Sequence, residues 1–356
     1  MRSAARTVTP PSLRPGSLLR GVLLAVSLLT ALVVAALPGT TIASSDPTLR
    51  ASIVSAEGAP ILVPVSMRSL VAVGNVGAVG GESIEVLAAE RPYRTTVAPS
   101  VLETATVVSV YGHPGVCVMG ELGCHGGPEG AIEAARSLAA EYDALNGDRP
   151  AVAALHLIVD VAQAKPGDDG EYLDQMPLDQ IAEWVEAARD AGVLLFLDIQ
   201  IGWGDLDEHV RRLEPFLEEP FVHLAVDPEF ATESRGARPG LVIGTLTSAQ
   251  VNAVQDYLRE IVLRTGQDSK ILVLHQFRPD MLTNPELIEA VDGVEVTIDM
   301  DGWGGPWPKV SGYEAYALAP YAERSAIKLF YKWDEPLLTP AEVMGMAEPP
   351  AYVIYQ

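Results

Sequence analysis

A short apolar, β-branched run followed by polar residues and then a helical stretch recurs eight times from Val107 onward. The eight runs are Val107–His113, Ala154–Asp160, Val193–Gln200, Val222–Glu229, Ile271–Phe277, Val294–Asp301, Ile327–Glu335 and Tyr352–Gln356. Strands that alternate with helices over about 250 residues are typical of a parallel (β/α)8 barrel. The pattern therefore predicts an α/β fold, with a TIM-barrel domain over residues 105–356.

Apolar residues at helical spacing predict the elements between these strands. Helices are expected at Glu129–Leu145, Pro177–Ala191, Leu206–Leu217, Ser248–Arg264, Asn284–Val291, Tyr313–Arg324 and Pro340–Met346. The second of them has a proline at its start and Gly192 just after its end, which are typical boundary residues. The segment Thr247–Gln250 resembles a capping box at the start of the fourth.

Alternation within the strands decides which side chains face the barrel axis. In the third run Asp198 and Gln200 share one side, and the aliphatic residues between them take the side that packs on helices. The same argument turns Asp227, His275 and Asp299 inward in the fourth, fifth and sixth runs. Because active sites of such barrels lie at the C-terminal strand ends, these side chains are predicted to converge on one site.

The predicted catalytic residues are the acids at the strand ends: Asp227, Glu229, Asp198 and Asp299. Buried carboxyls cannot all be ionised cheaply without cations or donors, so raised pKa values or a bound cation are expected. In Asp227-Pro228-Glu229 the proline ends the strand and directs the next acid into the loop. Paired carboxyls suit glycoside hydrolysis, which needs them roughly 5–9.5 Å apart. The alternative is that the acids only satisfy loop amides and helix N-termini.

The residues predicted to bind substrate are Tyr111, His113, Gln200, Trp203, His275, Gln276, Asp301, Trp303 and Lys332. Tryptophans in loops at a barrel mouth can stack on the apolar faces of sugar rings, or they can simply seal the loops. An alternative interpretation takes His113, Asp198, Asp227 and His275 as ligands of a hard or borderline cation, as in a phosphodiesterase or deacetylase. His156 and His209 are predicted to be a strand residue and a helix-surface residue.

The phosphate-binding and dinucleotide-binding motifs are absent from the sequence, so no cofactor is expected. The leading interpretation also assigns no metal. A net charge of −23 repels nucleic acid and anionic membranes. The same charge is compatible with a neutral or cationic ligand, or serves only solubility outside the cell.

Residues 1–43 are predicted to be a signal peptide or an uncleaved membrane anchor. A basic stretch ending at Arg20 precedes the apolar run Val22–Leu37, and small residues follow around Ala43. The run is short for a membrane span, which needs roughly 20 apolar residues. Residues 44–104 are rich in small residues and show no helical periodicity. They are predicted to be a linker or a small β segment.

The chain has two cysteines, Cys117 and Cys124. Export favours a disulfide between them. With His125 next to them they are also a weak candidate for a metal site, which would need further ligands.

Several segments resemble those of a group of exported actinobacterial-type proteins, often labelled hypothetical proteins or lipoproteins. They are YGHP, LDIQIGWGD, HLAVDPEF, PGLVIGTLTSAQVN, VLHQF, IDMDGWGGP and IKLFYKWD, and the resemblance covers residues 105–356. The chain departs from the lipoprotein members because no cysteine lies near the cleavage region. At the level of the fold it also resembles glycoside hydrolases with acids at the ends of strands four and six.

Together these observations predict a secreted barrel that cleaves a carbohydrate through paired carboxylates. The two alternatives are the metal-dependent hydrolase and a carbohydrate-binding barrel without catalysis. The expected partner is a carbohydrate ligand, with no nucleic acid and with membrane contact only through an N-terminal anchor. The sequence leaves the oligomeric state open.

Overall fold

The computed structural model describes residues 42–43, 50–54, 60–64 and 97–356. The chain divides into two units, Met1–Val86 and Leu87–Gln356. The first contains a three-stranded antiparallel sheet of β1 (Ile42–Ala43), β2 (Arg50–Val54) and β3 (Pro60–Pro64). Strands β2 and β3 belong to the predicted linker or small β segment. The predicted signal peptide, except for β1 at its end, lies outside the described residues.

The second unit is a closed barrel of eight parallel strands, as the sequence predicts. They are β4 (Thr106–Gly112), β5 (Ala151–Ala162), β7 (Leu194–Gln200), β8 (Val222–Asp227), β10 (Lys270–Gln276), β12 (Val294–Met300), β13 (Arg324–Leu329) and β14 (Tyr352–Tyr355). The last strand pairs with the first, because Tyr352 lies beside Val107 and Tyr355 beside Val110. The (β/α)8 fold class is therefore confirmed.

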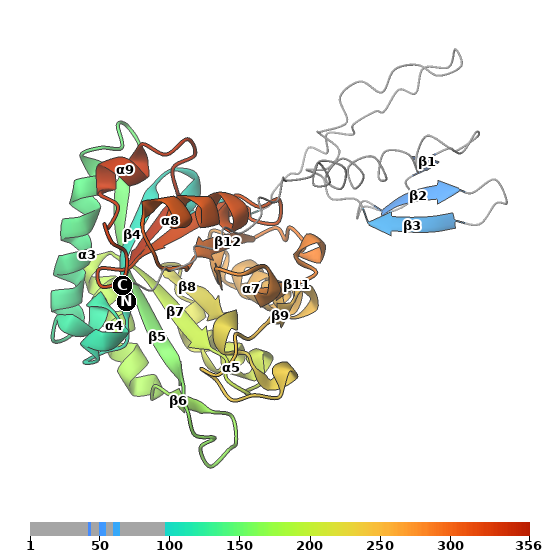
Figure 1. Cartoon of the computed structure of the whole chain (residues 1–356), viewed down its shortest axis with the longest axis horizontal. Helices are drawn as coiled ribbons and strands as arrows, with labels where there is room; N and C mark the ends of the chain where they lie inside the picture. Colours follow the sequence, from blue (N-terminus) through green and yellow to red (C-terminus); the bar gives the residue numbers. More distant parts are fainter. Residues whose placement is uncertain (1–41, 44–49, 55–59, 65–96) are drawn as a thin grey trace, which may run out of the picture. The chain divides into compact units, whose positions relative to one another are not determined.

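Helices cover the outside of the barrel (Figure 1). They are α3 (Pro128–Asp143), α4 (Leu178–Ala191), α5 (Leu206–Arg212), α6 (Glu214–Leu217), α7 (Ser248–Thr265), α8 (Pro306–Gly312) and α9 (Pro340–Met344). In Figure 1, α3 and α4 flank the strands on one side and α5 and α7 on the other. The predicted capping box at the start of α7 is confirmed, because Thr247 and Gln250 each accept the other's backbone N–H.

One predicted helix is wrong, and a second is helical over only part of its predicted range. Between β10 and β12 only a three-residue 3-10 turn, Pro285–Leu287, forms within the predicted helix Asn284–Val291. Asn284 has a left-handed backbone with φ of 54° directly before the proline, and neither feature permits a helix to start earlier. The helix predicted over Tyr313–Arg324 begins earlier as α8 and continues as one π-helical turn, Tyr313–Ala317. Pro320 prevents its extension toward Arg324.

The seventh strand lies earlier than predicted. The run Ile327–Glu335 was expected to be extended throughout, but β13 ends at Leu329. The Asp334 side chain accepts the backbone N–H of Phe330 at 2.9 Å and closes a turn over these residues. As a result Lys328, and not Lys332, lies in the strand.

Small, aliphatic and aromatic side chains fill the barrel interior between its polar groups. The apolar interior residues are Val107, Tyr111, Ala154, Ile158, Phe196, Ala225, Ile271, Val273, Ala326, Tyr352 and Ile354, with Leu102 packed against them. A second, larger apolar cluster lies between the strands and the helices. Aliphatic residues of β7 such as Leu195 and Leu197 belong to that outer cluster, which is the orientation that the alternation predicts.

The N-terminal end of the barrel is closed by residues that precede the predicted domain start at 105. The backbone N–H and hydroxyl of Ser100 donate to the Glu295 carboxylate at 2.8 and 2.7 Å. Arg324 donates to the same carboxylate from the neighbouring strand at 3.0 Å. Leu102, on the 3-10 turn Val101–Glu103, is 1% exposed.

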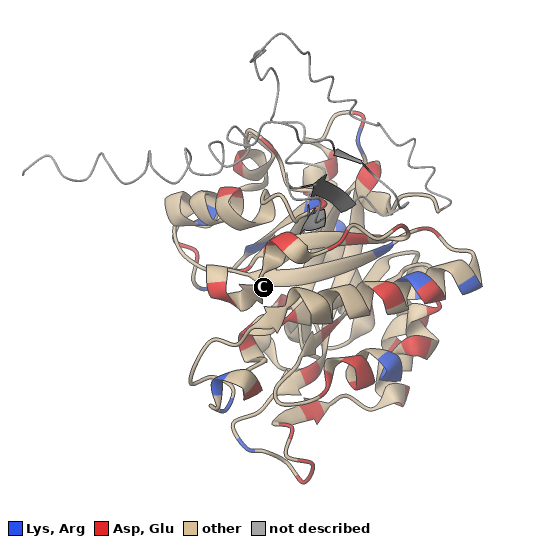
Figure 2. Ribbon diagram, turned by 90° about the vertical axis from the view of Figure 1, so that its right-hand side faces the viewer, with Lys and Arg blue, Asp and Glu red and all other residues tan. Residues whose placement is uncertain are grey.

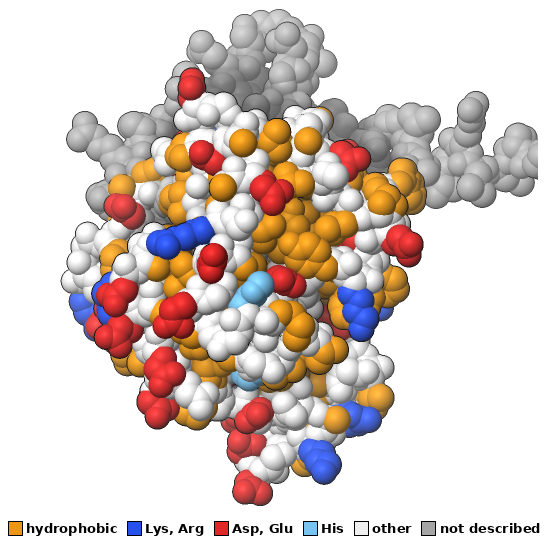
Figure 3. Space-filling view, turned by 90° about the vertical axis from the view of Figure 1, so that its left-hand side faces the viewer, with side chains coloured by type: hydrophobic (Ala, Val, Ile, Leu, Met, Phe, Trp, Pro, Cys, Tyr) orange, Lys and Arg blue, Asp and Glu red, His pale blue; other side chains and the backbone are white. Residues whose placement is uncertain are grey.

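Acidic residues are distributed over the helices and loops of the barrel unit, among fewer basic residues (Figure 2). The face that carries α3 shows the same mixture of acidic, neutral and apolar side chains (Figure 3). Among the described residues no helix is long and apolar enough to cross a membrane.

Candidate functional site

The candidate site consists of polar side chains inside the barrel near the C-terminal ends of its strands. Asp198 comes from β7, His275 from β10 and Asp299 from β12, and all three side chains are fully buried. Parallel register places His275 beside Asp299. The strand alternation used in the sequence analysis thus brings these three residues to one region.

Asp198 lies between two histidines. Its Oδ2 atom is 3.7 Å from Nε2 of His156 and 3.5 Å from Nε2 of His275. Neither carboxylate oxygen and neither Nε2 atom has a hydrogen-bond partner. The other ring nitrogen of His156 contacts the Tyr352 hydroxyl at 2.9 Å. These buried polar atoms therefore lie close together without forming hydrogen bonds to one another.

His275 also faces two further acids and a lysine. Its Nδ1 atom is 3.0 Å from Oδ2 of Asp299 and 3.2 Å from Oδ2 of Asp301. The Lys328 ammonium lies 2.9 Å from Oδ1 of Asp301 and 3.2 Å from Nδ1 of His275. It also lies 3.8 Å from the centre of the Tyr111 ring. Lys328 is thus the main fixed positive charge among the interior acids.

These charges shift the pKa values of the interior groups. Burial raises the pKa of Asp198, but the nearby rings of His275 and His156 outweigh it and hold this pKa well below its usual range. Burial and Lys328 lower the pKa of His275, while Asp198 and Asp299 raise it to a net value well above normal. Burial opposes the charged form of Asp301 too, yet Lys328 and His275 lower its pKa.

Asp227 and Glu229 lie at the end of β8 and on the turn after it. Their pKa values shift in the direction opposite to those of Asp198 and Asp301. Burial, with added repulsion from other acids, raises the pKa of Asp227 well above its usual range. Burial and the charge of Asp301 raise the pKa of Glu229 to about 7, against the influence of Lys328 and His275. As the proline predicts, β8 stops at Asp227 and a 3-10 turn, Pro228–Phe230, follows. Oδ1 of Asp227 accepts the backbone N–H of Glu229 at 2.9 Å and so fixes that turn.

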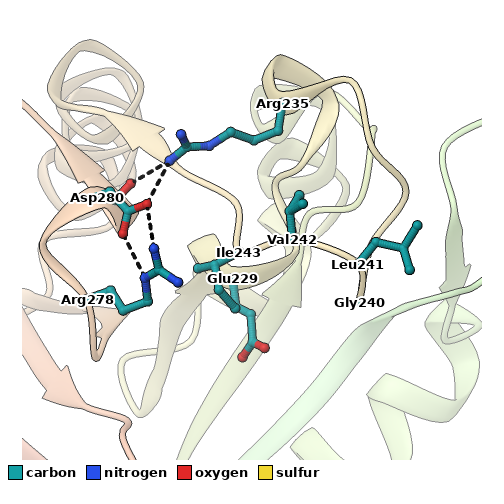
Figure 4. Close-up of a pocket in the computed structure, with 8 residues that line it drawn as sticks. All are labelled: Glu229, Arg235, Gly240, Leu241, Val242, Ile243, Arg278 and Asp280. Atoms are coloured by element: carbon teal, nitrogen blue, oxygen red, sulfur yellow. Dashed lines mark hydrogen bonds and ion pairs between the residues drawn. The ribbon is translucent and has the colours of Figure 1, made fainter.

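A pocket of about 560 Å³ opens beside Glu229. It is lined by Glu229, Arg235, Gly240, Leu241, Val242, Ile243, Arg278 and Asp280. Glu229 extends between Arg278 and the loop around Leu241, as Figure 4 shows. Asp280 pairs with both arginines, at 2.9 Å to Nε of Arg278 and 3.3 Å to Arg235. The pocket is built from loops that follow β8 and β10, at the C-terminal end of the barrel.

Several residues predicted to bind substrate hold the structure together. Gln200 accepts the backbone N–H of Ala162 at 2.9 Å, and Gln276 accepts the Tyr321 hydroxyl at 2.9 Å. Nδ1 of His113 contacts the carbonyl oxygen of Ile158 at 3.0 Å. Tyr111 is buried below Lys328.

Trp203 is partly buried, and its indole N–H reaches Thr232 Oγ1 and the Ala237 carbonyl oxygen, both at 3.2 Å. This side chain joins two loops and offers little free surface.

Three exposed tryptophans follow β12 and β13: one on the loop after β12, one in the first turn of α8 and one on the loop after β13. Trp303 is 69% exposed and Trp307 is 81% exposed. Trp333 is 42% exposed. The two loops are joined because Oδ1 of Asp334 accepts the backbone N–H of Gly304 at 2.8 Å. Lys332 is exposed beside Trp333, with its ammonium 5.7 Å from the ring centre.

His156 and Lys328 are central to the site, but the sequence pattern does not assign them to it. His156 stands in the run LHLIV, where apolar residues occupy both phases. Lys328 stands in the run Ile327–Glu335, where apolar residues also occupy both phases. Their signal is the alternation itself, since His156 is two residues from the inward Ile158, and Lys328 two from the inward Ala326.

The prediction that His209 is a helix-surface residue is wrong. Its ring is 3% exposed and contacts Asp160 at 2.7 Å. Arg212 pairs with the other oxygen of Asp160 at 3.0 Å. A bulge between Ile158 and Asp160 shifts the register of β5 against β7. The shift turns Asp160 away from the axis and toward α5, so this strand-end acid joins two elements.

Within the described residues, two groups have three potential metal-ligand atoms within 4.8 Å of one another: His156, Asp198 and His275, and His275, Asp299 and Asp301. The predicted ligands His113 and Asp227 belong to neither group. The predicted disulfide Cys117–Cys124 is confirmed, which leaves no thiol for a metal at that segment. A disulfide fits an extracellular protein.

No protein-family model matches the chain, and no curated protein matches it either.

Proposed function

We propose that the barrel is a carbohydrate hydrolase in which Glu229 donates the proton to the leaving group and Asp301 is its carboxylate partner. The observation that carries this proposal is the position of Glu229, a half-buried carboxyl on the turn after β8 that lines the pocket. A general acid needs such a place, partly shielded from water and open to a substrate.

Asp301 supplies the second carboxyl. It follows β12, and its two oxygens are held by Lys328 and His275 at 2.9 and 3.2 Å. These ion pairs favour the ionised form. One protonated and one ionised carboxyl, at the ends of the fourth and sixth strands, form the kind of pair that glycoside hydrolysis uses. Asp198 and Asp299 are fully buried, so in this proposal they support the site from below.

Asp227 is a positioning residue in this proposal. Its carboxyl is 2% exposed and holds the backbone N–H that begins the Glu229 turn. A carboxamide can accept the same hydrogen bond. Asp227→Asn should therefore keep most activity, whereas Asp227→Ala should lose it. Equal loss in both variants would instead place the Asp227 carboxyl in the chemistry.

The exposed indoles give the sugar-binding surface. Trp303 lies on the loop between β12 and α8, and Trp307 lies in the first turn of α8, shortly after Asp301 in the chain. Stacking on sugar faces gives them a reason to be exposed, which large aromatic side chains at a monomer surface otherwise lack.

Hydrolysis of a glycan panel by purified protein tests the proposal. Glu229→Gln should lower kcat about 100-fold to 10,000-fold, the usual loss for a general acid. Glu233→Gln is the matched control, because Glu233 is an exposed glutamate on the next turn of the same loop. Binding of a glycan with no hydrolysis by the wild type would support the alternative of a non-catalytic carbohydrate-binding barrel.

We also propose that the chain is exported, with cleavage after Ala43. The disulfide between Cys117 and Cys124 supports this. N-terminal sequencing of the protein from the culture medium should begin at Ser44. Retention of the whole chain in the membrane fraction would favour the uncleaved anchor.

A further inference from the structure

We propose that His156, Asp198 and His275 bind one borderline divalent cation of the zinc type inside the barrel. Two imidazoles and one carboxylate are a common ligand set for Zn²⁺ and similar ions. This set differs from the metal site that the sequence suggested, which needed His113 and Asp227. The proposal is independent of the proposed hydrolysis, because Glu229 and Asp301 are not among the ligands.

The distances between the three side chains fit such an ion. With bonds of about 2.0–2.1 Å at tetrahedral angles, ligand atoms lie about 3.4 Å apart. Oδ2 of Asp198 is 3.5 Å from Nε2 of His275 and 3.7 Å from Nε2 of His156. These values are too long for good hydrogen bonds and suited to two atoms that share a cation. All three side chains are fully buried.

The hydrogen bonds around His156 support a cation at this place independently of the distances. The Tyr352 hydroxyl donates its hydrogen to Oγ of Ser109 at 2.8 Å. Its oxygen therefore accepts from Nδ1–H of His156 at 2.9 Å. A neutral imidazole with its hydrogen on Nδ1 has a lone pair on Nε2. That lone pair faces the Asp198 carboxylate, an acceptor, so a buried positive group between them would satisfy both.

His275 has the corresponding second contact. Its Nδ1 atom is 3.0 Å from Oδ2 of Asp299, while its Nε2 atom points at Asp198 without a hydrogen-bond partner. Histidines that bind metals almost always donate their other ring N–H to a carboxylate or another acceptor, which fixes the ring and its tautomer. The Tyr352 hydroxyl takes this role for His156, and Asp299 is the carboxylate nearest to Nδ1 of His275.

The second group of potential metal ligands, His275, Asp299 and Asp301, already has the positive charge of a lysine beside it. Between His275, Asp299 and Asp301 the Lys328 ammonium lies 2.9 Å from Asp301 and 3.2 Å from Nδ1 of His275. An ion at that place would meet the charge of the lysine. The His156–Asp198–His275 group has no lysine or arginine among the ion pairs of Asp198 in the described residues.

Because the ligands are buried, the ion should enter during folding, as in other buried metal sites. The full chain would be unfolded without reductant, so that the disulfide stays intact, and refolded with Co²⁺ or Zn²⁺. After removal of free metal, elemental analysis should find one ion per chain in the wild type. The Co²⁺ form should show visible absorption of a cobalt ion with nitrogen and oxygen ligands.

Variants distinguish a specific metal site from a metal ion that the chain retains nonspecifically. His156→Asn and Asp198→Asn should lose the ion. His223→Asn is the matched control, since His223 is also buried in the barrel but only accepts the Ile271 N–H. Tyr352→Phe keeps all three ligands but removes the hydrogen bond to His156. It should weaken metal affinity about 10-fold to 100-fold, measured by competition with a chelator.

A wild-type chain that refolds but retains no ion would overturn the proposal. Equal retention by the wild type, His156→Asn and Asp198→Asn would overturn it as well. If the ligand variants do not fold, the Tyr352→Phe competition decides, because unchanged affinity there would show that the ion is not bound through His156. None of these measurements depends on hydrolytic activity.

Discussion

Glu229 shows how one side chain at the mouth of the barrel acquires a proton affinity that its type does not have in water. It is half-buried, and burial together with the charge of Asp301 raises its pKa to about 7. Its pKa in the unfolded chain is close to the ordinary value of about 4.3. The folded state therefore binds a proton in the pH range between these values that the unfolded state releases.

Removal of the Glu229 charge should therefore change how the stability of the barrel depends on pH. Stability of the wild type should fall as pH rises from about 4.5 to 7, because ionising Glu229 is easier in the unfolded chain. Glu229→Gln should lack this loss and be more stable than the wild type at pH 8 by about 1–2 kcal/mol, after a discount for partial exposure. Urea unfolding at pH 5 and pH 8 measures the difference. Equal pH dependence in both proteins would contradict the raised pKa.

Lys328 should be the more important of the two neighbouring lysines. It is 1% exposed and pairs with Asp301, whereas Lys332 is exposed beside Trp333. Lys328→Met leaves the interior carboxylates without their ammonium and should cost about 3–5 kcal/mol. Lys332→Met should stay within about 0.5 kcal/mol. Chemical unfolding of both variants tests this, and equal small effects would mean that Lys328 does not balance the buried acids.

At the scale of elements, the bulge in β5 decides what Asp160 does. Because the register shifts after Ile158, Asp160 leaves the axis and joins β5 to α5 through His209 and Arg212. Burial lowers the pKa of His209, but the hydrogen bond and charge of Asp160 raise it above its ordinary value. An ion pair of this kind stabilises the chain only while the histidine carries its proton.

The Asp160 contact should therefore have a clear pH dependence. The stability due to protonated His209 is fully present below about pH 6.5, the ordinary histidine pKa, and is lost as pH rises through the raised pKa of the folded state. Asp160→Asn should cost about 3 kcal/mol at pH 6 and less at pH 9, where only Arg212 still pairs with the acid. Asp207→Asn, which removes an exposed pair with Arg211, is the control. If Asp160→Asn costs the same free energy of unfolding at pH 6 and pH 9, protonated His209 does not pair with Asp160.

The elements that the sequence analysis predicted well are those with a clear alternation. In β7 the aliphatic residues take one phase and Asp198 the other, so both the strand and its inward side follow from the pattern. The run containing Lys328 has apolar residues in both phases, and its end depends on the Asp334 contact to the Phe330 backbone. Such contacts between a side chain and the backbone are set by tertiary packing, which a sequence pattern does not show.

The sequence pattern likewise predicts only those site residues whose positions follow from the strands themselves. Asp198, Asp227, His275 and Asp299 lie at strand ends, where the barrel topology alone brings them to one end. The direction of Asp160 depends on a bulge, and the importance of His156 depends on where the Tyr352 hydroxyl lies. Both are properties of neighbouring strands far away in the chain, so they became visible only with the fold.

For the whole barrel unit, the two ends of the barrel have different tasks. The C-terminal end carries the pocket and the exposed tryptophans. The N-terminal end is sealed by Ser100, Leu102 and the ion pair of Glu295 with Arg324. The closed N-terminal end keeps the buried charges of the interior away from water.

The seal at the N-terminal end should therefore determine the stability of the barrel without touching its chemistry. Leu102 is 1% exposed and belongs to the same apolar cluster as the interior residues Val107 and Tyr352, so Leu102→Ala should cost about 2–4 kcal/mol. Val101→Ala is the control on the same turn, because Val101 is only partly buried. Urea unfolding measures the loss, and the kcat for any identified substrate should remain unchanged under conditions where the variant is folded. A loss of kcat with unchanged stability would instead show that the two ends of the barrel are coupled, because Leu102 lies at the end opposite Glu229.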